Sequence, residues 1–515
     1  MKAVDVLILN GKELTLQDVA DVAVHGRKVE IAEEAFGLLK KGRELMQSLA
    51  DSGKAIYGFN RGVGWNKDIC VAQDEIEAYN YELLRTHALG VPPYHTDEEV
   101  RAMMVIRLNN MLIGTACATD ELAKRYRDFL NHGIHPLIPK RGSVGDADIT
   151  TLSHMGLAFT GEVDVRYQGK VVPAAEAIKE EGLPEYQMKL KDAHTIILSN
   201  AQGEGLTALL AVKTRQLVDL VNLIYCLDYE GLNGNIEAMC EEVNRIRGLP
   251  GQIESAAQCR KFLKGSYLYQ PDENRALQDS LTFRGGFAIQ GTVLDALHVV
   301  EKFLNIQINS PSDNPAIVLE KENTFVTCNF ETATLAAAVE MLTIALSHMS
   351  KSISYRMIKM TDPHFTGLTR YLAAWDDSSL GYATIQNTYT ALDVENRFLC
   401  NPSSVDFYPM EGMIEDHGAN LPLAAEKALK MVDNICYLAG MEALYAAQAV
   451  DLRQMKYGKM NLGEYTEKAY KAIRSCIPFL GENRNMHEEI KKIYAFVTSG
   501  ELNKIIKENG EEKLL

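Results

Sequence analysis

The chain has 515 residues, 46% hydrophobic and 24% charged, which is typical of a globular protein large enough to form several packed units. Its 53 basic and 69 acidic residues give a net charge of −16, which argues against nucleic acid or an anionic membrane as the main partner and favours a small molecule. The start of the chain lacks the apolar run of a signal peptide, and no later stretch of about 18 residues is apolar without a charge, so we expect a cytoplasmic protein.

The first fifty residues combine a short aliphatic segment with a charged helical stretch and carry no recognisable chemistry. The nine cysteines lie far apart in the sequence, and no pair has the Cys-x-x-Cys spacing of a zinc or redox site. We therefore expect reduced, mostly buried thiols and no metal site.

The segment from Gly53 to Gly64 holds four glycines and one tyrosine, Tyr57, within twelve residues. Glycine density lets a backbone close over a ligand and reopen, and a tyrosine carried on such a loop can enter a pocket from above. The alternative is a tyrosine that only anchors the loop. Further along, the apolar spacing from Glu75 to Thr115 predicts long helices. His87 lies in this stretch, and a lone histidine on a helix usually has a structural role.

A shaped loop leads into a helix between residues 140 and 156. Gly142 and Gly145 allow backbone conformations that other residues resist. Asp146 and Asp148 fall where an N-cap and a first-turn acid would precede the helix. On spacing alone, this stretch is a capped core helix.

The second half of the chain is strongly helical. Before it, alternating apolar residues between Gly161 and Pro184 predict a hairpin. From Leu206 onward, apolar residues recur at helical spacing and form stripes that we interpret as core or subunit interface. Two such stripes are Leu335, Val339, Leu342, Leu346 and Met349, and Leu429, Val432, Cys436, Ala439 and Ala443.

Motifs between about residues 50 and 450 occur in the same order as in the histidine and phenylalanine ammonia-lyase family, which the chain therefore resembles. They are the Tyr57 loop, Thr86-His-Ala-Leu-Gly90, Gly142-Ser-Val-Gly145 with its Leu-Ser-His-Met continuation, Ser199-Asn-Ala-Gln-Gly203, Gln278-Asp-Ser-Leu-Thr-Phe-Arg284, Asn309-Ser-Pro-Ser-Asp-Asn-Pro315, Thr327-Cys-Asn-Phe-Glu331 and Pro409-Met-Glu-Gly-Met-Ile-Glu-Asp-His417. The resemblance implies a mainly α-helical fold with a long central bundle, a homotetramer, and active sites shared between subunits.

The resemblance also implies roles for single residues. Tyr57 matches the base that removes the β-proton, as phenolate or with a pKa lowered by Arg61 and other cations. His87 matches a histidine near the substrate ring and favours an imidazole there. Asn200 matches the family's active-site asparagine, whose amide can donate to the carboxylate of an amino acid and accept from its ammonium group. Arg284 can hold the same carboxylate with two donors of its guanidinium. Glu415 matches the substrate-facing glutamate. Gln278, Asn329 and Phe330 also match family positions at the substrate. Arg61 and Glu411 replace the family's usual residues and are expected to bring charge to the site, and Phe330, Tyr382 or Trp65 is expected to form an aromatic wall for a cation.

The chain departs from the family where the catalytic electrophile is made. In the family an Ala-Ser-Gly tripeptide cyclises and dehydrates to a methylidene-imidazolone (MIO) group, whereas here only Asp146 and Ala147 separate Gly145 from Asp148. Neither the serine nor the glycine is present, and Leu281 replaces the family's tyrosine. We therefore expect no MIO and no other cofactor.

Three hypotheses follow from these departures. An ordinary histidine ammonia-lyase needs MIO to make ammonia a leaving group. A catalytically inactive binding homologue has no reason to retain the site residues. A carbon–nitrogen lyase independent of MIO needs a substrate whose leaving group is already good, and a quaternary ammonium meets that need because trimethylamine departs without activation. We favour the third, with a histidine-derived betaine as substrate, and expect Asp146, Asp148 and Glu411 to offset its cation.

We expect three consecutive segments. Residues 1–200 would hold the catalytic loop and the MIO-equivalent region, residues 201–450 the central helical bundle, and residues 451–515 a C-terminal helical segment whose function cannot be read from the sequence. The expected partners are a small-molecule betaine or amino acid and further copies of the chain, without nucleic acid or membrane.

Overall fold

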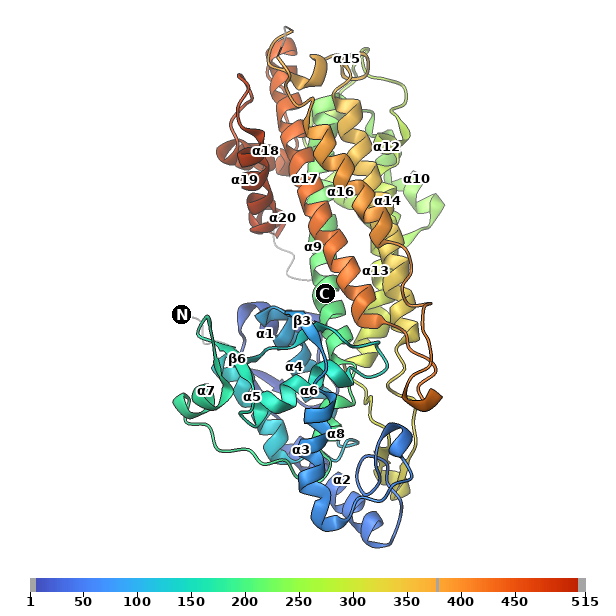
Figure 1. Ribbon diagram of the computed structural model, residues 1–515. Helices are drawn as coiled ribbons and strands as arrows, with labels where there is room; N and C mark the ends of the chain where they lie inside the picture. The colour runs from blue at the N-terminus through green and yellow to red at the C-terminus, as the bar shows by residue number, and fades with distance from the viewer. Residues whose placement is uncertain (1–5, 377–378, 508–515) are drawn as a thin grey trace. The chain divides into compact units, whose positions relative to one another are not determined.

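The computed structural model describes residues 6–376 and 379–507, and the chain divides into two compact units (Figure 1). Unit 1 comprises residues 1–212, 300–339 and 402–426, and unit 2 comprises residues 213–299, 340–401 and 427–515. The units are interleaved in sequence, so they differ from the three consecutive segments expected above. Segments distant in sequence contact one another in each unit, which a division along the chain does not capture.

Unit 1 mixes helices with short strands. Its helices are α1 (Leu16–His25), α2 (Glu33–Asp51), α3 (Ile76–His87), α4 (Asp97–Met111), α5 (Asp120–His132), α6 (Ile149–Phe159), α7 (Ala174–Glu180) and α8 (Asp192–Ile197). Its strands are β1 (Leu7–Leu9), β2 (Val29–Ile31), β3 (Val91–Tyr94), β4 (His135–Pro136), β5 (Pro139–Arg141), β6 (Asp164–Tyr167), β7 (Lys170–Pro173), β8 (Ala316–Val318) and β9 (Asn323–Phe325).

These strands form small sheets with the orders β1-β2, β3-β5, β4-β6-β7 and β8-β9. The first pair is parallel and the others are antiparallel. The hairpin expected between Gly161 and Pro184 is confirmed as β6 and β7, with Tyr167 opposite Lys170. Gln168 and Gly169 have φ of 49° and 74°, the left-handed pair that a tight hairpin turn requires.

Four long helices have residues in both units: α9 (Ala201–Leu232), α13 (Gly286–Gln307), α14 (Ala333–Met360) and α17 (Leu421–Tyr457). The remaining helices belong to unit 2 and are α10 (Glu241–Arg247), α11 (Pro250–Phe262), α12 (Leu281–Arg284), α15 (Pro363–Thr366), α16 (Ile385–Leu399), α18 (Glu464–Cys476), α19 (Met486–Thr498) and α20 (Glu501–Lys507).

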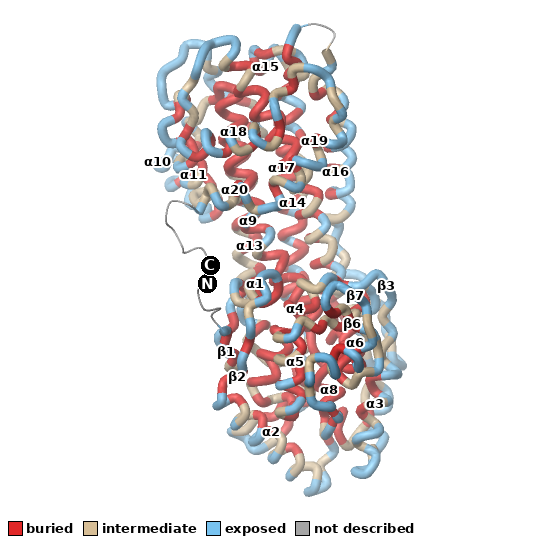
Figure 2. The backbone as a smooth tube through the Cα atoms, turned by 90° about the vertical axis from the view of Figure 1, so that its left-hand side faces the viewer, coloured by how far each residue is buried: buried red, intermediate tan, exposed pale blue. Residues whose placement is uncertain are grey.

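The core of unit 2 is a helical bundle in which segments of α9, α14, α16 and α17 run side by side (Figures 1 and 2). The apolar stripe predicted from Leu335 to Met349 is buried along α14, because its spacing keeps one face of the helix apolar. The mainly α-helical fold predicted from the resemblance is therefore confirmed.

Within the described residues, α14 is the one helix long and apolar enough to cross a membrane by length and composition, but 61% of its apolar window is buried inside the protein. This degree of burial fits a core helix.

Candidate active site

Tyr57, on the glycine-rich loop of unit 1, makes two contacts that fix its side chain. Its hydroxyl accepts a hydrogen bond from the Gly64 amide at 2.8 Å. Its ring meets the ring of His194, from α8, edge to face with centroids 5.6 Å apart. Gly64 has φ of 56°, which an L side chain resists, so glycine is needed where the loop turns its amide toward the tyrosine.

The charges around Tyr57 are acidic. Burial raises the pKa of Tyr57, the Gly64 amide partly lowers it, and the carboxylates of Glu415 and Glu411 raise it further. Arg61 donates instead to the carbonyl of Asn60 at 2.8 Å. The expectation that Arg61 lowers the pKa of Tyr57 is therefore wrong, because sequence proximity does not set which charges face the hydroxyl.

Glu411 and Glu415 lie on a tight loop that reaches the Tyr57 segment. The amide of Met410 donates to the carbonyl of Glu415 at 2.8 Å, which closes the loop. A carboxylate oxygen of Glu411 lies 3.4 Å from the position that a Cβ on Gly64 would take. The helical turn Glu411–Met413 packs against Gly64–Asn66, so both carboxylates lie beside the base candidate.

Asp146 joins the same acidic group from the junction loop. Its backbone bridges that of Glu331, and Thr332 donates from its hydroxyl to the Gly145 carbonyl at 2.8 Å, so these two segments are fastened together. Burial, followed by the charges of Glu331 and Glu415, raises the pKa of Asp146 to about 7. Asp146 is therefore poised to change charge near neutral pH.

The residues at the junction do not fit an MIO group. Positions 146 and 147 hold no serine to dehydrate and no glycine to cyclise. The hydroxyl of Ser143 donates to Asp148 and accepts from the Gly145 amide. The amide nitrogen of Asp148 donates to the Ser199 carbonyl at 2.7 Å, so it is engaged as an ordinary peptide. No step of the proposed chemistry is therefore assigned to MIO.

Asp148 caps a different helix from the one expected. Its backbone occupies the N-cap position of α6 without a side-chain bond to that helix. Its carboxylate accepts instead from the amides of Gln202 and Gly203, at 2.9 and 3.3 Å, in the first turn of α9. Asp148 is 1% exposed, so it stabilises the start of α9 rather than offsetting a substrate charge.

Asn200 directly precedes this capped turn. It is 3% exposed, and within the described residues its side-chain oxygen has no hydrogen-bond partner. A buried acceptor without a partner costs about 1–3 kcal/mol, so a ligand that donates to it would remove that cost. The position is compatible with the expected substrate contact.

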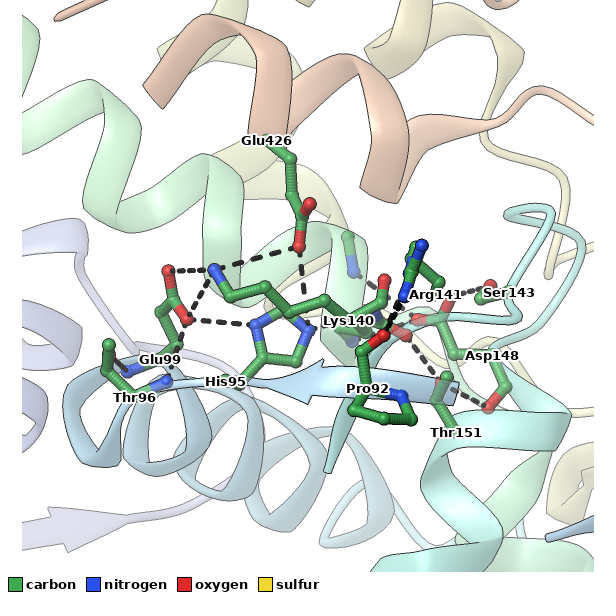
Figure 3. A network of polar contacts seen from close by, with 12 residues as sticks. Pro92, His95, Thr96, Glu99, Lys140, Arg141, Ser143, Asp148, Thr151 and Glu426 are labelled. Atoms are coloured by element: carbon green, nitrogen blue, oxygen red, sulfur yellow. Dashed lines mark hydrogen bonds and ion pairs between the residues drawn. The ribbon is translucent and has the colours of Figure 1, made fainter. Parts of the chain in front are cut away.

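The capped turn is tied to a buried polar network (Figure 3). The side-chain nitrogen Nε2 of Gln202 donates to Nε2 of His95 at 3.0 Å, so Nδ1 of His95 carries the proton and donates to Glu99 at 2.9 Å. Lys140 bridges Glu99 and Glu426, at 3.2 and 3.8 Å. Burial alone would raise the pKa of Glu99, but the bonds to His95 and Thr96 and the charge of Lys140 lower it to about 2. The network joins β5, α4, α9 and the start of α17.

His87 ends α3 and lines a pocket of about 510 Å³ between this helix and the segment that follows the Tyr57 loop, which contributes Val63, Asn66 and Ile69. Its Nδ1 lies 2.7 Å from the Leu83 carbonyl, which makes Nδ1 the donor and leaves Nε2 as an acceptor in the neutral ring. This arrangement could serve an imidazole ligand.

The remaining predicted residues divide between the units. Asn329 and Phe330, exposed and half-buried, precede Glu331 in unit 1. Gln278 and Arg284 lie in unit 2, where the guanidinium donates to the Gln278 side chain. Tyr382, also in unit 2, is 1% exposed and stacks on Tyr445. The expectation that Tyr382 forms an aromatic wall for a substrate does not fit this burial, because its ring is part of the helical core.

Two residues of this region were not predicted: Glu331, which lies beside Asp146, and His194, which contacts Tyr57. Glu331 ends a motif that was recognised, so its position beside Asn329 and Phe330 was an available signal. His194 is a lone histidine in a buried helix, and nothing in the sequence distinguishes it from a structural residue.

A model of the aromatic amino acid lyase family matches residues 14–475. The chain belongs to this family. It is 30% identical to a histidine ammonia-lyase of Alkaliphilus oremlandii over 96% of this chain and 97% of that protein. Its fold is similar to that of ergothionase from Treponema denticola, an ergothioneine-degrading enzyme solved with desmethyl-ergothioneine sulfonic acid, with 49% identity, a TM-score of 0.93, and coverage of 97% and 99% of the two chains. A tyrosine aminomutase from Streptomyces globisporus gives the same TM-score at 27% identity, with coverage of 99% and 100%.

Proposed function

We propose that this lyase eliminates trimethylamine from a histidine-derived betaine, converting ergothioneine to thiourocanate without an MIO group. The observation that carries the proposal is the junction Gly145 to Asp148, which lacks the residues of the electrophile and holds Asp146 in an acidic group instead. The similarity to ergothionase at 49% identity supports the same substrate class.

An acidic site suits a permanent cation. A quaternary ammonium has no N–H to donate, so a protein recognises it through carboxylates and aromatic faces. Asp146, Glu331, Glu411 and Glu415 act electrostatically on one another or on Tyr57. A primary ammonium could bind there too, but nothing at the junction would activate ammonia as a leaving group.

The proposed reaction is a base-catalysed β-elimination. Tyr57 takes the proton from the β-carbon, the electron pair of that bond forms the double bond, and the carbon–nitrogen bond breaks to release neutral trimethylamine. In the free enzyme burial, with a further contribution from the acidic neighbours, raises the pKa of Tyr57, so its hydroxyl is largely protonated. A bound cation offsets those neighbours and favours the phenolate, which links base activation to substrate binding.

The other predicted contacts orient the substrate in this proposal. Arg284 and Gln278 would hold its carboxylate. The Asn200 oxygen would accept from a ring N–H, because neither the carboxylate nor the trimethylammonium group carries a donor. His87 and Phe330 would contact the substrate's ring. Asn329 and Arg61 would add polar groups to the wall of the substrate site. Glu415 is the next candidate for the base. We further propose a cytoplasmic homotetramer.

Three substrates separate this proposal from its alternatives. The pure enzyme is incubated with histidine, hercynine or ergothioneine, and the ultraviolet band of a conjugated acrylate and the released amine are measured. We expect ergothioneine to react fastest, because its thiol-imidazole spreads charge from the β-carbon, with trimethylamine released in equal amount.

Each other outcome contradicts a part of the proposal. Faster turnover of hercynine would identify another aromatic betaine as the substrate. Release of ammonia from histidine, or an intact mass showing dehydration at the junction, would identify an ordinary ammonia-lyase. Inactivity toward all three would favour an unrelated betaine or a binding protein.

A further inference from the structure

His194 lies directly beneath the proposed base. It belongs to the six-residue helix α8 and is 3% exposed. The Tyr57 ring meets its ring at 5.6 Å with an interplanar angle of 81°, an arrangement that aromatic pairs favour. His194 is absent from the motifs that the sequence resemblance rests on.

The backbone after Tyr57 is seated on the same ring. A Cβ on Gly58 would lie 2.4 Å from Cδ2 and 2.6 Å from Nε2 of His194, closer than real Cβ contacts come. Gly58 also has φ of 65°. Glycine is therefore required twice at this position, by the conformation and by the approach to His194.

The helix that carries His194 is fixed on both sides. The Thr195 carbonyl accepts from Nε of Arg107 at 2.9 Å, and its hydroxyl donates to the Ala116 carbonyl at 3.0 Å. Asp192 accepts from the amide and hydroxyl of Thr119, at 3.0 and 2.8 Å. The imidazole therefore has a rigid support.

The surroundings of His194 disfavour a charge on its ring. Burial, followed by the charges of Lys191, Arg107 and His87, lowers its pKa well below the ordinary value. The ring is therefore neutral at physiological pH. Its Nδ1 is buried and has no hydrogen-bond partner within the described residues.

We propose that His194 is a positioning residue whose ring carries the Tyr57–Gly58 turn and thereby holds the Tyr57 hydroxyl at the Gly64 amide and at the substrate's β-carbon. The inference rests on the proposed role of Tyr57 as base. Displacing a catalytic group by about 1 Å can cost about 100-fold in rate, so a support of this kind has a measurable effect.

Two substitutions at His194 test the inference. In His194→Ala the support is lost, and we expect kcat to fall about 10- to 100-fold. Water would enter beside Tyr57 and reduce the burial that raises its pKa, so the ascending limb of kcat, where Tyr57 loses its proton, should move to lower pH. His194→Phe keeps a ring and removes the unpaired nitrogen, so kcat should stay within about threefold and the melting temperature should not fall.

A double-mutant cycle tests the contact itself. Gly58→Ala places a Cβ against the His194 ring and should lower kcat strongly, but less so in the His194→Ala background where the collision is absent. Gly133→Ala is the matched control, because Gly133 has φ of 67° with nothing near its Cβ position, so it carries the backbone strain alone.

Several results would overturn the inference. An unchanged kcat in His194→Ala would remove the need for a support, and an equal loss in His194→Phe would assign chemistry to the imidazole nitrogens. Additive effects of Gly58→Ala and His194→Ala would deny the contact. If the wild type turns over none of the betaines, the proposed function fails instead. The tyrosinate absorbance of Tyr57, identified by difference from Tyr57→Phe, would still report whether His194→Ala shifts its titration.

Discussion

Tyr57 is the residue on which the proposed chemistry depends most directly. Tyr57→Phe keeps the ring on His194 but removes the oxygen that accepts from Gly64 and would take the β-proton. We expect kcat for trimethylamine release to fall about 10²- to 10⁴-fold, the usual cost of removing a general base. Full activity in this variant would move the role of base to Glu415.

Asp146 should make substrate binding depend on pH. Its pKa is raised from 3.8 to about 7, so the carboxyl is neutral below that pH and negative above it. We therefore expect KM for a betaine to rise as the pH falls from 8 to 6, while Asp146→Asn raises KM at pH 8 by about 3- to 10-fold and flattens this dependence.

A steady-state pH series of both proteins measures the effect of Asp146. Asp164→Asn, on the exposed start of β6, provides a control in which the pH dependence should remain. An Asp146→Asn enzyme whose KM still rises toward pH 6 would assign that titration to another group.

Single residues also mark how far the sequence predicts the site. Tyr57 and Glu415 were identified through the resemblance and Glu411 as a departure from it, and the structure groups them in unit 1. The sign of the Tyr57 pKa shift was not predictable, because it depends first on burial in the folded chain and then on carboxylates from a segment far along the sequence. His194 was missed because its contact arises only from the close approach of Gly58.

At the scale of the elements, Asp148 connects the junction loop to the start of α9. Asp148→Ala would leave the Gln202 and Gly203 amides unpaired. We expect a loss of about 1–2 kcal/mol in the free energy of unfolding, the usual cost of removing a helix cap. Chemical denaturation at constant pH measures this loss.

Asp148→Asn is the matched variant for this cap, because its amide oxygen still accepts from the α9 amides. It should retain more stability than Asp148→Ala. Equal losses in the two variants would show that the negative charge, and not the acceptor, stabilises α9.

The periodicity of the sequence predicted the elements better than their contacts. Alternation identified the β6-β7 hairpin, and helical spacing identified the buried stripe of α14. Asp148 was predicted to cap α6, the helix that follows it in the sequence, because most helix caps are local. The sequence does not indicate that the first turn of α9 lies close enough to be capped instead. The boundaries of the units were also missed, since long helices contribute residues to both.

At the scale of the whole molecule, the predicted site draws on residues from both units. Tyr57, Glu411 and Glu415 are in unit 1, whereas Gln278 and Arg284 are in unit 2. The family resemblance implies that sites are shared between subunits, and a homotetramer is part of the proposed function. Substrate contacts would then come from more than one copy of the chain.

Hybrid oligomers test this arrangement. Tyr57→Phe and Arg284→Met are each expected to be nearly inactive alone. If one chain supplies Tyr57 and another supplies Arg284, random mixing in equal amounts should restore about a quarter of wild-type activity, because each site then needs two independent wild-type contributions. Co-expression with two affinity tags isolates the hybrids for assay. In the control, a chain carrying both substitutions is mixed with wild type in equal amounts and should keep about a quarter of the activity if the site is shared, but about half if the site lies in one chain. Hybrids that remain as inactive as the separate variants would place Tyr57 and Arg284 of each site in one chain.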